Sequence, residues 1–304
     1  MKTTIYVPDI ECESCSKLIS RKLKHKEGIN QISIKPDSVD IDYDESKIKP
    51  EQLVQTIKDA EFRAGLEPFE RKTFKERWRD FKENKKKYHL ELKGIEYAAF
   101  IFLILTALEA IAYFGFLKTP TFLTNYGWWF FYLNISITAI SFGLWHIFAY
   151  KTKITCMVGM MIGMTLGMQT GMMIGAILGA TNGFFIGAMT GMILGVTVGI
   201  IAGKCCGIMG IMEGMMAGLM GGTMGPMISL MMFSDHLLWF MPAYMIINLL
   251  IIAGLSYMMY EEVVEYKEVR KQPLDFLTIA SLCIIVAFVL IMIILYGPKA
   301  AFLR

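Results

Sequence analysis

A glycine stands at every fourth residue from Gly159 to Gly207, and the spacing resumes one residue out of phase from Gly210 to Gly222. The residues between these glycines are mostly Met, Ile, Leu, Val, Ala and Thr. In water each glycine would disfavour a helix by about 1 kcal/mol relative to alanine. In a bilayer the same spacing lets helix backbones approach one another closely. The segment therefore predicts membrane helices with a Gly-x-x-x-Gly packed core.

The four-residue period also predicts how these helices are surrounded. Because an α-helix turns 100° per residue, each step of four moves the glycine about 40° around the helix. Over one span the glycines therefore sweep about half of the helix surface. We expect each of these helices to contact several neighbours closely, with right-handed crossings.

Hydrophobicity divides the chain into a charged part and an apolar part. Most of the charge precedes residue 95, and the remainder contains apolar stretches of the ~20 residues needed to cross a bilayer. We expect an all-α polytopic domain over 95–304, with a glycine- and methionine-rich core at 154–232. Beside such a domain a nucleic-acid partner is not expected. The seven predicted spans are 95–117, 128–150, 154–178, 184–203, 207–232, 236–260 and 274–296.

Residues 1–69 predict a small α+β domain. Alternating apolar residues indicate strands, and apolar residues at helical spacing indicate two helices between them. The resulting order, βαββαβ, is that of a ferredoxin-like fold. The expected strands are 2–7, 29–35, 39–43 and 62–68, and the expected helices are 16–25 and 50–59.

Cys12 and Cys15 lie between the first strand and the first helix of this domain. Two thiols three residues apart can reach one ion, and a helix N-terminus favours the thiolate form that binds it. Soft thiolates select Cu(I), Zn(II) or related ions. A closed zinc site needs four ligands, so two local ligands favour Cu(I), Ag(I) or Hg(II). A redox-active Cys-x-x-Cys is the alternative.

Residues 2–68 resemble the heavy-metal-associated domain of copper chaperones and metal-pumping ATPases. The resemblance implies a ferredoxin-like fold with a metal site at Cys12 and Cys15, Cu(I) as the expected ion, and a soluble metallochaperone as one possible partner. Before Cys12 this chain has Asp9-Ile10-Glu11, where the family usually has Gly-Met-x. The matching features are Cys12-x-x-Cys15, Gly28-Ile29, the strand Val39–Asp44 and the turn Ala60-Glu61-Phe62.

The segment 70–94 is basic and carries Phe74, Trp78 and Phe81 on one helical face. This pattern predicts an amphipathic juxtamembrane helix on the headgroup surface, with a solvated charged linker as the alternative. If the chain crosses the membrane seven times, most basic residues outside the spans lie on the same side of the membrane as this segment. The positive-inside rule then predicts a multi-pass protein of the cell membrane with a cytoplasmic N-terminal domain.

Methionines accompany the glycines in two rows with a spacing of four. Thioether sulfur is a soft, uncharged ligand for Cu(I) or Ag(I), and it binds weakly enough to release the ion along a path. The arrangement is similar to Met-x-x-x-Met in Ctr-type copper uptake proteins. Those are small three-helix trimers, and the longer array here departs from them, so only their metal coordination carries over. Independently of this resemblance, a homo-oligomer stays open as a partner. The alternative is that methionine only fills gaps left by glycine. The rows are Met160, Met164, Met168 and Met172, and Met212, Met216, Met220 and Met224.

Five further residues are candidates in or near the spans. Cys205 and Cys206 form a vicinal pair at a predicted cytoplasmic span end, as also occurs in mercury-uptake membrane proteins, and can pass an ion to the Cys-x-x-Cys loop. Glu109 and His146 are ionisable residues within spans, where such groups are costly and often functional. Each lies toward a span end, so the alternative interpretation is that its side chain extends to the polar interface of the membrane and has no further role. Glu213, beyond the cysteine pair, can neutralise a cation.

The sequence contains neither a phosphate-binding Gly-x-x-x-x-Gly-Lys-Ser/Thr loop nor the Asp-Lys-Thr-Gly motif of P-type pumps. It therefore does not support ATP-driven transport, and we expect no enzymatic activity. The favoured hypothesis is a membrane protein that binds and transports soft heavy-metal ions, with the Cys-x-x-Cys domain as donor or acceptor. Two alternatives stay open: a membrane-anchored metal-binding or sensing module without transport, and a membrane thiol oxidoreductase.

Overall fold

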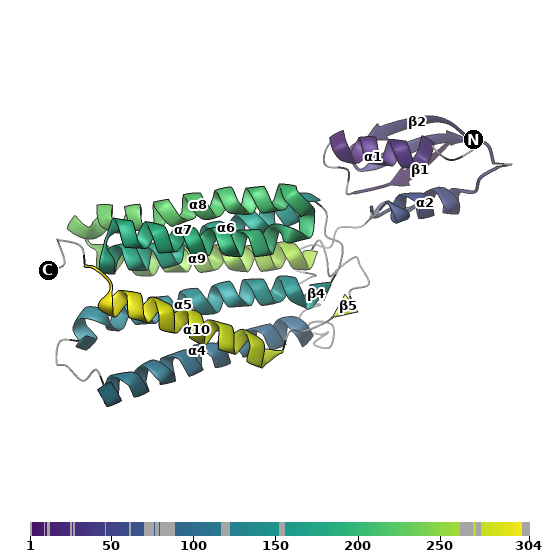
Figure 1. The fold of residues 1–304 in the computed structure, drawn as a ribbon. Coiled ribbons are helices and arrows are strands. Elements are labelled where there is room, and N and C mark those ends of the chain that lie inside the picture. Colours follow the sequence, from purple (N-terminus) through teal and green to yellow (C-terminus); the bar gives the residue numbers. More distant parts are fainter. Residues whose placement is uncertain are drawn as a thin grey trace. The chain divides into compact units, whose positions relative to one another are not determined.

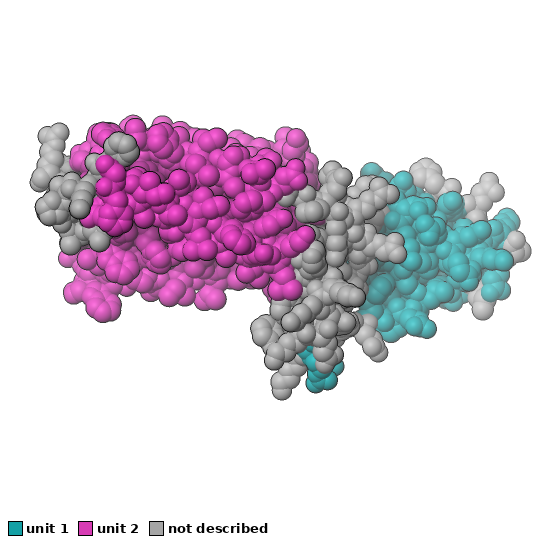
Figure 2. Space-filling view, turned by 90° about the horizontal axis from the view of Figure 1, so that it is seen from below, with its two compact units in different colours: residues 1–84 teal, residues 85–304 magenta. Residues whose placement is uncertain are grey.

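The computed structural model divides the chain into two compact units, Met1–Asn84 and Lys85–Arg304 (Figure 2). Each unit has its own apolar core, so each is described by itself. The residues that the structure describes are 2–8, 10, 13–24, 26, 28–45, 47–60, 62–69, 76, 79, 89–116, 122–151, 156–261, 270–271 and 275–299. The aromatic positions of the predicted amphipathic helix, Phe74, Trp78 and Phe81, lie outside them.

The first unit is a three-stranded antiparallel sheet, with strand order β1-β3-β2, and two helices (Figure 1). On the central strand Val39, Ile41 and Tyr43 alternate inward and are buried, as the period of two requires. Ile19 and Leu53 from the two helices belong to the same core. The elements are β1 (Lys2–Tyr6), α1 (Glu13–Lys24), β2 (Ile29–Lys35), β3 (Ser38–Tyr43) and α2 (Pro50–Asp59).

The predicted fourth strand at 62–68 is wrong. Only one bridge forms there, in which the Tyr6 amide donates to the Gly65 carbonyl at 2.8 Å and the Gly65 amide donates to the Tyr6 carbonyl at 3.1 Å. Beyond Gly65 the side chains of residues 66–69 are exposed, and Pro68 has no amide hydrogen for a ladder. The ferredoxin-like order is therefore retained with its last strand reduced to a single bridge.

The second unit is helical (Figure 1). Two-residue strands, β4 (Tyr150–Lys151) and β5 (Arg270–Lys271), pair antiparallel between helices of this unit. The long helices are α4 (His89–Phe116), α5 (Phe122–Ala149), α6 (Cys156–Asn182), α7 (Phe184–Gly203), α8 (Gly207–Met231), α9 (Leu237–Met259) and α10 (Phe276–Tyr296).

Six segments among the described residues are long and apolar enough to cross a membrane. They indicate a multi-pass membrane protein. The predicted number is seven, and the difference lies in 184–234, where α7, the short 3-10 helix η1 (Lys204–Cys206) and α8 together count as one segment although α8 folds back along α7. The six segments are Leu92–Gly115, Tyr126–Ala149, Met157–Asn182, Phe184–Ser234, Leu237–Met259 and Phe276–Tyr296.

Helices α6, α7 and α8 pack against one another through glycine. A methyl group added to Gly167 of α6 would lie 2.8 Å from the Gly214 carbonyl oxygen of α8. One added to Gly195 of α7 would lie 2.8 Å from the Gly218 carbonyl oxygen. Since real Cβ atoms do not approach backbone this closely, only hydrogen fits at these positions. The three backbones therefore lie in direct contact, and no side chain separates them.

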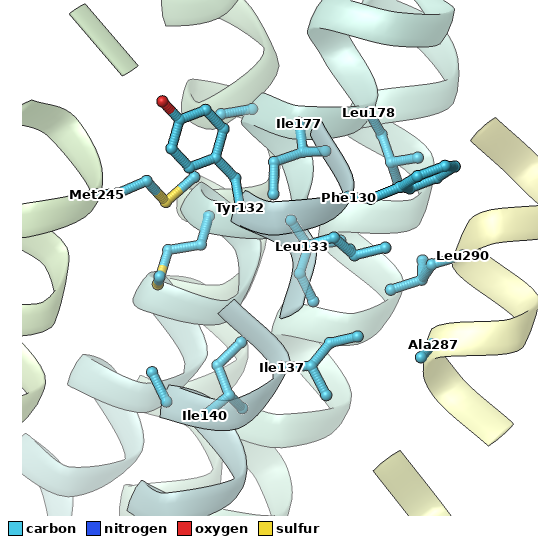
Figure 3. Packing of buried hydrophobic residues seen from close by; sticks show 14 of the residues in the cluster. Phe130, Tyr132, Leu133, Ile137, Ile140, Ile177, Leu178, Met245, Ala287 and Leu290 are labelled. Atoms are coloured by element: carbon cyan, nitrogen blue, oxygen red, sulfur yellow. The ribbon is translucent and has the colours of Figure 1, made fainter. Parts of the chain in front are cut away.

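The remaining helices pack on this three-helix group through ordinary side chains (Figure 3). Leu133 and Ile137 of α5 lie at the centre of the cluster, which also contains Ile177 of α6, Met245 of α9 and Leu290 of α10. All five are buried. Two kinds of packing therefore coexist in the helical unit: glycine backbones in α6–α8 and interdigitated apolar side chains around α5.

The glycine contacts generate a stability prediction. Gly214→Ala places a methyl group against the Gly199 backbone and should destabilise the folded chain by about 1–3 kcal/mol or more, as overpacking does. Gly254→Ala on α9 is the matched control, because nothing lies within 4 Å of its added Cβ. Thermal unfolding in detergent, followed by circular dichroism, measures both. Equal stability of the two variants would contradict close contact between α7 and α8.

The sheet generates a second prediction, concerning Asp40. A hydrogen bond from Lys35 at 2.9 Å, and then one from the Thr4 hydroxyl at 2.8 Å, hold the Asp40 pKa below its ordinary value of 3.8. The stabilisation is complete above pH 3.8 and is lost as the pH falls through the lower folded-state pKa. Lys35→Met should raise the Asp40 pKa, and Lys58→Met on α2 should leave it unchanged. NMR titration of the carboxyl carbon measures the pKa, and an unchanged value in Lys35→Met would contradict the assignment.

Candidate metal-binding site

Cys15 lies in the first turn of α1 and is half-buried. Ile19 and Leu23, one and two turns further along, are fully buried against the sheet and fix the orientation of the helix. The first amides of a helix lack intrahelical acceptors, so an anionic sulfur is favoured at this end. Cys12 lies outside the described residues. The structure thus places one of the two predicted thiol ligands at a helix N-terminus.

The family model of the heavy-metal-associated domain matches residues 4–63. Residues 4–63 form a heavy-metal-associated domain. Heavy-metal binding is therefore the function that this part of the chain indicates. No curated protein and no solved structure matches the chain.

The heavy-metal-associated domain differs from the usual family pattern just before its cysteines. Ile10 stands where the family usually has methionine, and its side chain is buried in the domain core. An apolar residue keeps the packing role of methionine but has no sulfur. At this position the chain therefore offers no thioether ligand, and the predicted soft ligands of the loop are the thiols of Cys12 and Cys15.

A second pair of thiols lies at one end of the three-helix group, in η1 between α7 and α8. The Sγ atoms of Cys205 and Cys206 are 3.9 Å apart, and the Cys205 thiol donates to the Ala202 carbonyl at 3.4 Å. Cys205 is exposed and Cys206 is half-buried. If one ion bound both sulfurs at about 2.3 Å, the sulfur–metal–sulfur angle would be about 115°. That angle lies between trigonal and tetrahedral geometry, so the ion would take one or two further ligands.

Both sulfurs of this pair lie against Gly159 in α6. A methyl group added to Gly159 would overlap the Sγ atom of Cys206 and lie 2.9 Å from the Sγ atom of Cys205. Gly159 was predicted only as part of the packing pattern. Its contact with the thiols depends on how α6 meets the α7–α8 connection, and nothing in the local sequence indicates that meeting.

The predicted methionine row of α8 lies on the outer face of that helix. Met212, Met216, Met220 and Met224 are between 44% and 61% exposed. The glycines of the same helix from Gly210 to Gly225 are buried on the opposite side, against α6 and α7. These four methionines therefore face away from the glycine contacts that join the three helices.

The row on α6 lies differently. Met164 is exposed, whereas Met160, Met168 and Met172 are half-buried. The backbones of Met168 and Met172 lie directly beside Gly221 and Gly225 of α8. This row therefore flanks the α6–α8 contact.

The ionisable candidates fall at separate places in the helical unit. Glu109 of α4 accepts a hydrogen bond from the buried Asn134 of α5, so it points into the bundle. His146 is buried, and its ring stacks on Phe142 at 5.8 Å. Glu213 is half-buried on α8. Across the described part of the chain, no three His, Cys, Asp or Glu side chains gather as a metal site.

The position of Gly159 predicts an effect on dithiol chemistry. In a Cys12→Ser, Cys15→Ser background, phenylarsine oxide should bridge Cys205 and Cys206. Gly159→Ala should weaken this binding about fivefold or more, because the methyl group displaces the sulfurs at a cost of ~1 kcal/mol or above. Gly115→Ala is the control, since its added Cβ meets nothing within 4 Å. Mass spectrometry of the intact protein measures the adduct, and equal binding by both variants would contradict this arrangement of the pair.

Proposed function

We propose that this chain is a non-enzymatic membrane protein that moves Cu(I), Ag(I) or a related soft ion across the bilayer. In this proposal the heavy-metal-associated domain is cytoplasmic and exchanges the ion at Cys12 and Cys15. The observation that carries the proposal is the fusion of a heavy-metal-associated domain to a helical unit with six apolar segments of membrane-spanning length. With an ion-binding domain joined to membrane helices, one chain can both bind the metal ion and move it across the bilayer.

In this proposal Cys205 and Cys206 form an intermediate binding site, which holds the ion between the membrane and the Cys-x-x-Cys loop. It lies at an end of α7 and α8 and offers the same soft ligands as the Cys-x-x-Cys loop. Lys204 beside the pair is consistent with the cytoplasmic side.

Within the membrane the proposed path follows the α6 methionines toward this pair. They flank the α6–α8 contact, whereas the α8 row lies on an outer face. In this proposal α7 and α8 each cross the membrane separately, so that the chain has seven transmembrane helices. The glycine contacts form a zipper that holds α6, α7 and α8 together. A membrane potential negative inside contributes about 2.3 kcal/mol per charge per 100 mV and favours uptake followed by thiolate capture.

One observation favours a second candidate function, a membrane-anchored metal-binding module without transport. The methionines of α8 lie opposite its glycines and face outward, so they have no evident role in a path within the chain. In that case the glycine contacts only assemble the helices, and the metal chemistry is confined to the cysteines.

Replacing the α6 row discriminates the two functions. The variant with Met160, Met164, Met168 and Met172 changed to Leu keeps apolar volume but removes the thioether ligands. Transport predicts that Cu(I) or Ag(I) flux into vesicles containing the reconstituted protein falls at least about tenfold, while thermal stability is retained. Replacing the α8 row by Leu is the matched control and should leave the flux unchanged. Absence of flux with the wild-type chain would contradict transport and leave the anchored module.

Metal content tests the two thiol pairs. Under reducing conditions the wild-type chain should bind about one Cu(I) per pair, because each pair supplies two soft ligands. Cys12→Ser with Cys15→Ser should remove one equivalent, and the further changes Cys205→Ser and Cys206→Ser should remove the other. Cys283→Ser is the control, since this buried thiol contacts Ser141 rather than a second cysteine. Full Cu(I) content after loss of Cys12 and Cys15 would contradict the assigned main site.

A further inference from the structure

The helical unit contains a groove of about 850 Å³ between α4, α5 and α10, and neither a cysteine nor a glycine of α6, α7 or α8 lines it. Its walls are apolar and partly aromatic, with Phe114, Phe130 and Phe288 among them. Phe114 and Phe288 are strongly exposed, so the groove opens on the apolar surface of the unit. Its volume falls within the range of about 300–1,000 Å³ that is usual for sites that bind small molecules.

One carboxyl group belongs to the lining of this apolar groove. Glu109 is among the residues that line the groove, and none of these lining residues is Lys, Arg or His. It lies seven residues before the end of α4 at Phe116, which is about 10 Å along the helix. That depth places the carboxyl among the apolar side chains of the span and not at its end.

The hydrogen bonding of Glu109 is incomplete. Its Oε2 atom accepts a hydrogen bond of 2.7 Å from the Nδ2 atom of Asn134, which is fully buried. Its Oε1 atom is also shielded from solvent, yet it has no hydrogen-bond partner within the described structure. A buried carboxylate without a cationic partner is costly, and a ligand with a positive charge would offset that cost.

The surroundings of Glu109 select among cations. A hard metal ion needs several oxygen ligands, but the groove offers one carboxyl, and the nearby Thr106 hydroxyl already donates to the Phe102 carbonyl. A soft ion needs sulfur, and Met292 is the one sulfur-containing residue of the lining. An organic cation instead fits the carboxyl, the apolar walls and the aromatic rings of the groove. Its apolar body contacts the walls, and the faces of the aromatic rings attract its charge.

We propose that this groove binds a monovalent lipophilic organic cation, with the Glu109 carboxylate as its counter-charge. Asn134 is a positioning residue, which holds one carboxylate oxygen and leaves the other without a partner among the described residues. The site is independent of the soft-metal function, because it shares no residue with the two cysteine pairs or the methionine rows.

The test uses the full-length protein in nanodiscs and radiolabelled tetraphenylphosphonium as the probe. Saturable binding is expected, and tetraphenylborate, which has the same shape and the opposite charge, should not compete. Glu109→Gln should weaken binding at least about tenfold, as expected for loss of one partner of a buried charge pair. Glu213→Gln is the matched control, because it removes a carboxyl of α8 that does not line the groove. Cys12→Ser with Cys15→Ser should bind the probe as the wild-type chain does, which separates this proposal from the metal function.

Three results would overturn the proposal: no saturable binding, equal affinity in Glu109→Gln, or effective competition by tetraphenylborate. A copurifying phospholipid that the probe cannot displace would overturn it as well. Should Glu109→Gln fail to fold, Ala112→Phe tests the site in its place. Ala112 lines the groove, and a larger side chain there occupies space that the probe needs. Loss of binding in that variant supports the site, and unchanged binding contradicts it.

Discussion

Direct contact between glycine backbones is the constraint on which the helical unit depends. Where α6, α7 and α8 meet, a single methyl group at Gly167 or Gly195 would collide with a neighbouring carbonyl. Every larger side chain on these helices must therefore lie beside or opposite the contact. The outward methionines of α8 are one consequence, and the side-chain packing of α5, α9 and α10 around this group is another.

The same constraint separates the chemistry of the helical unit into different places. Because the backbone contacts leave no room for a ligand between the three helices, the thiols lie at their end, where Cys205 and Cys206 cover Gly159. The carboxyl of Glu109 lies elsewhere, in a groove lined by α4, α5 and α10. Soft ligands and the buried carboxyl therefore do not form one site.

Local periodicity was enough to predict most elements to within a few residues. Helices Pro50–Asp59 and Phe184–Gly203 have the expected bounds, because proline at a helix start and glycine or lysine at a helix end mark them locally. The strand expected at 62–68 failed because a strand requires a partner, and only Gly65 meets Tyr6. The Cys-x-x-Cys loop was identified from spacing and resemblance, whereas the groove around Glu109 was not, since its walls come from three helices far apart in sequence.

By itself the sequence determined that an ion-binding α+β domain precedes apolar helices and that three of these helices carry glycine at every fourth residue. Both follow from residue type and spacing along the chain. Only the tertiary structure decided which faces those residues occupy. A helix that carries glycines on one face and methionines on the other can bury either of these faces, and the neighbouring helix determines which one is buried. Backbone contact requires the glycine face, so the α8 methionines point outward, and the partnership of Glu109 with Asn134 likewise arises only when α4 meets α5.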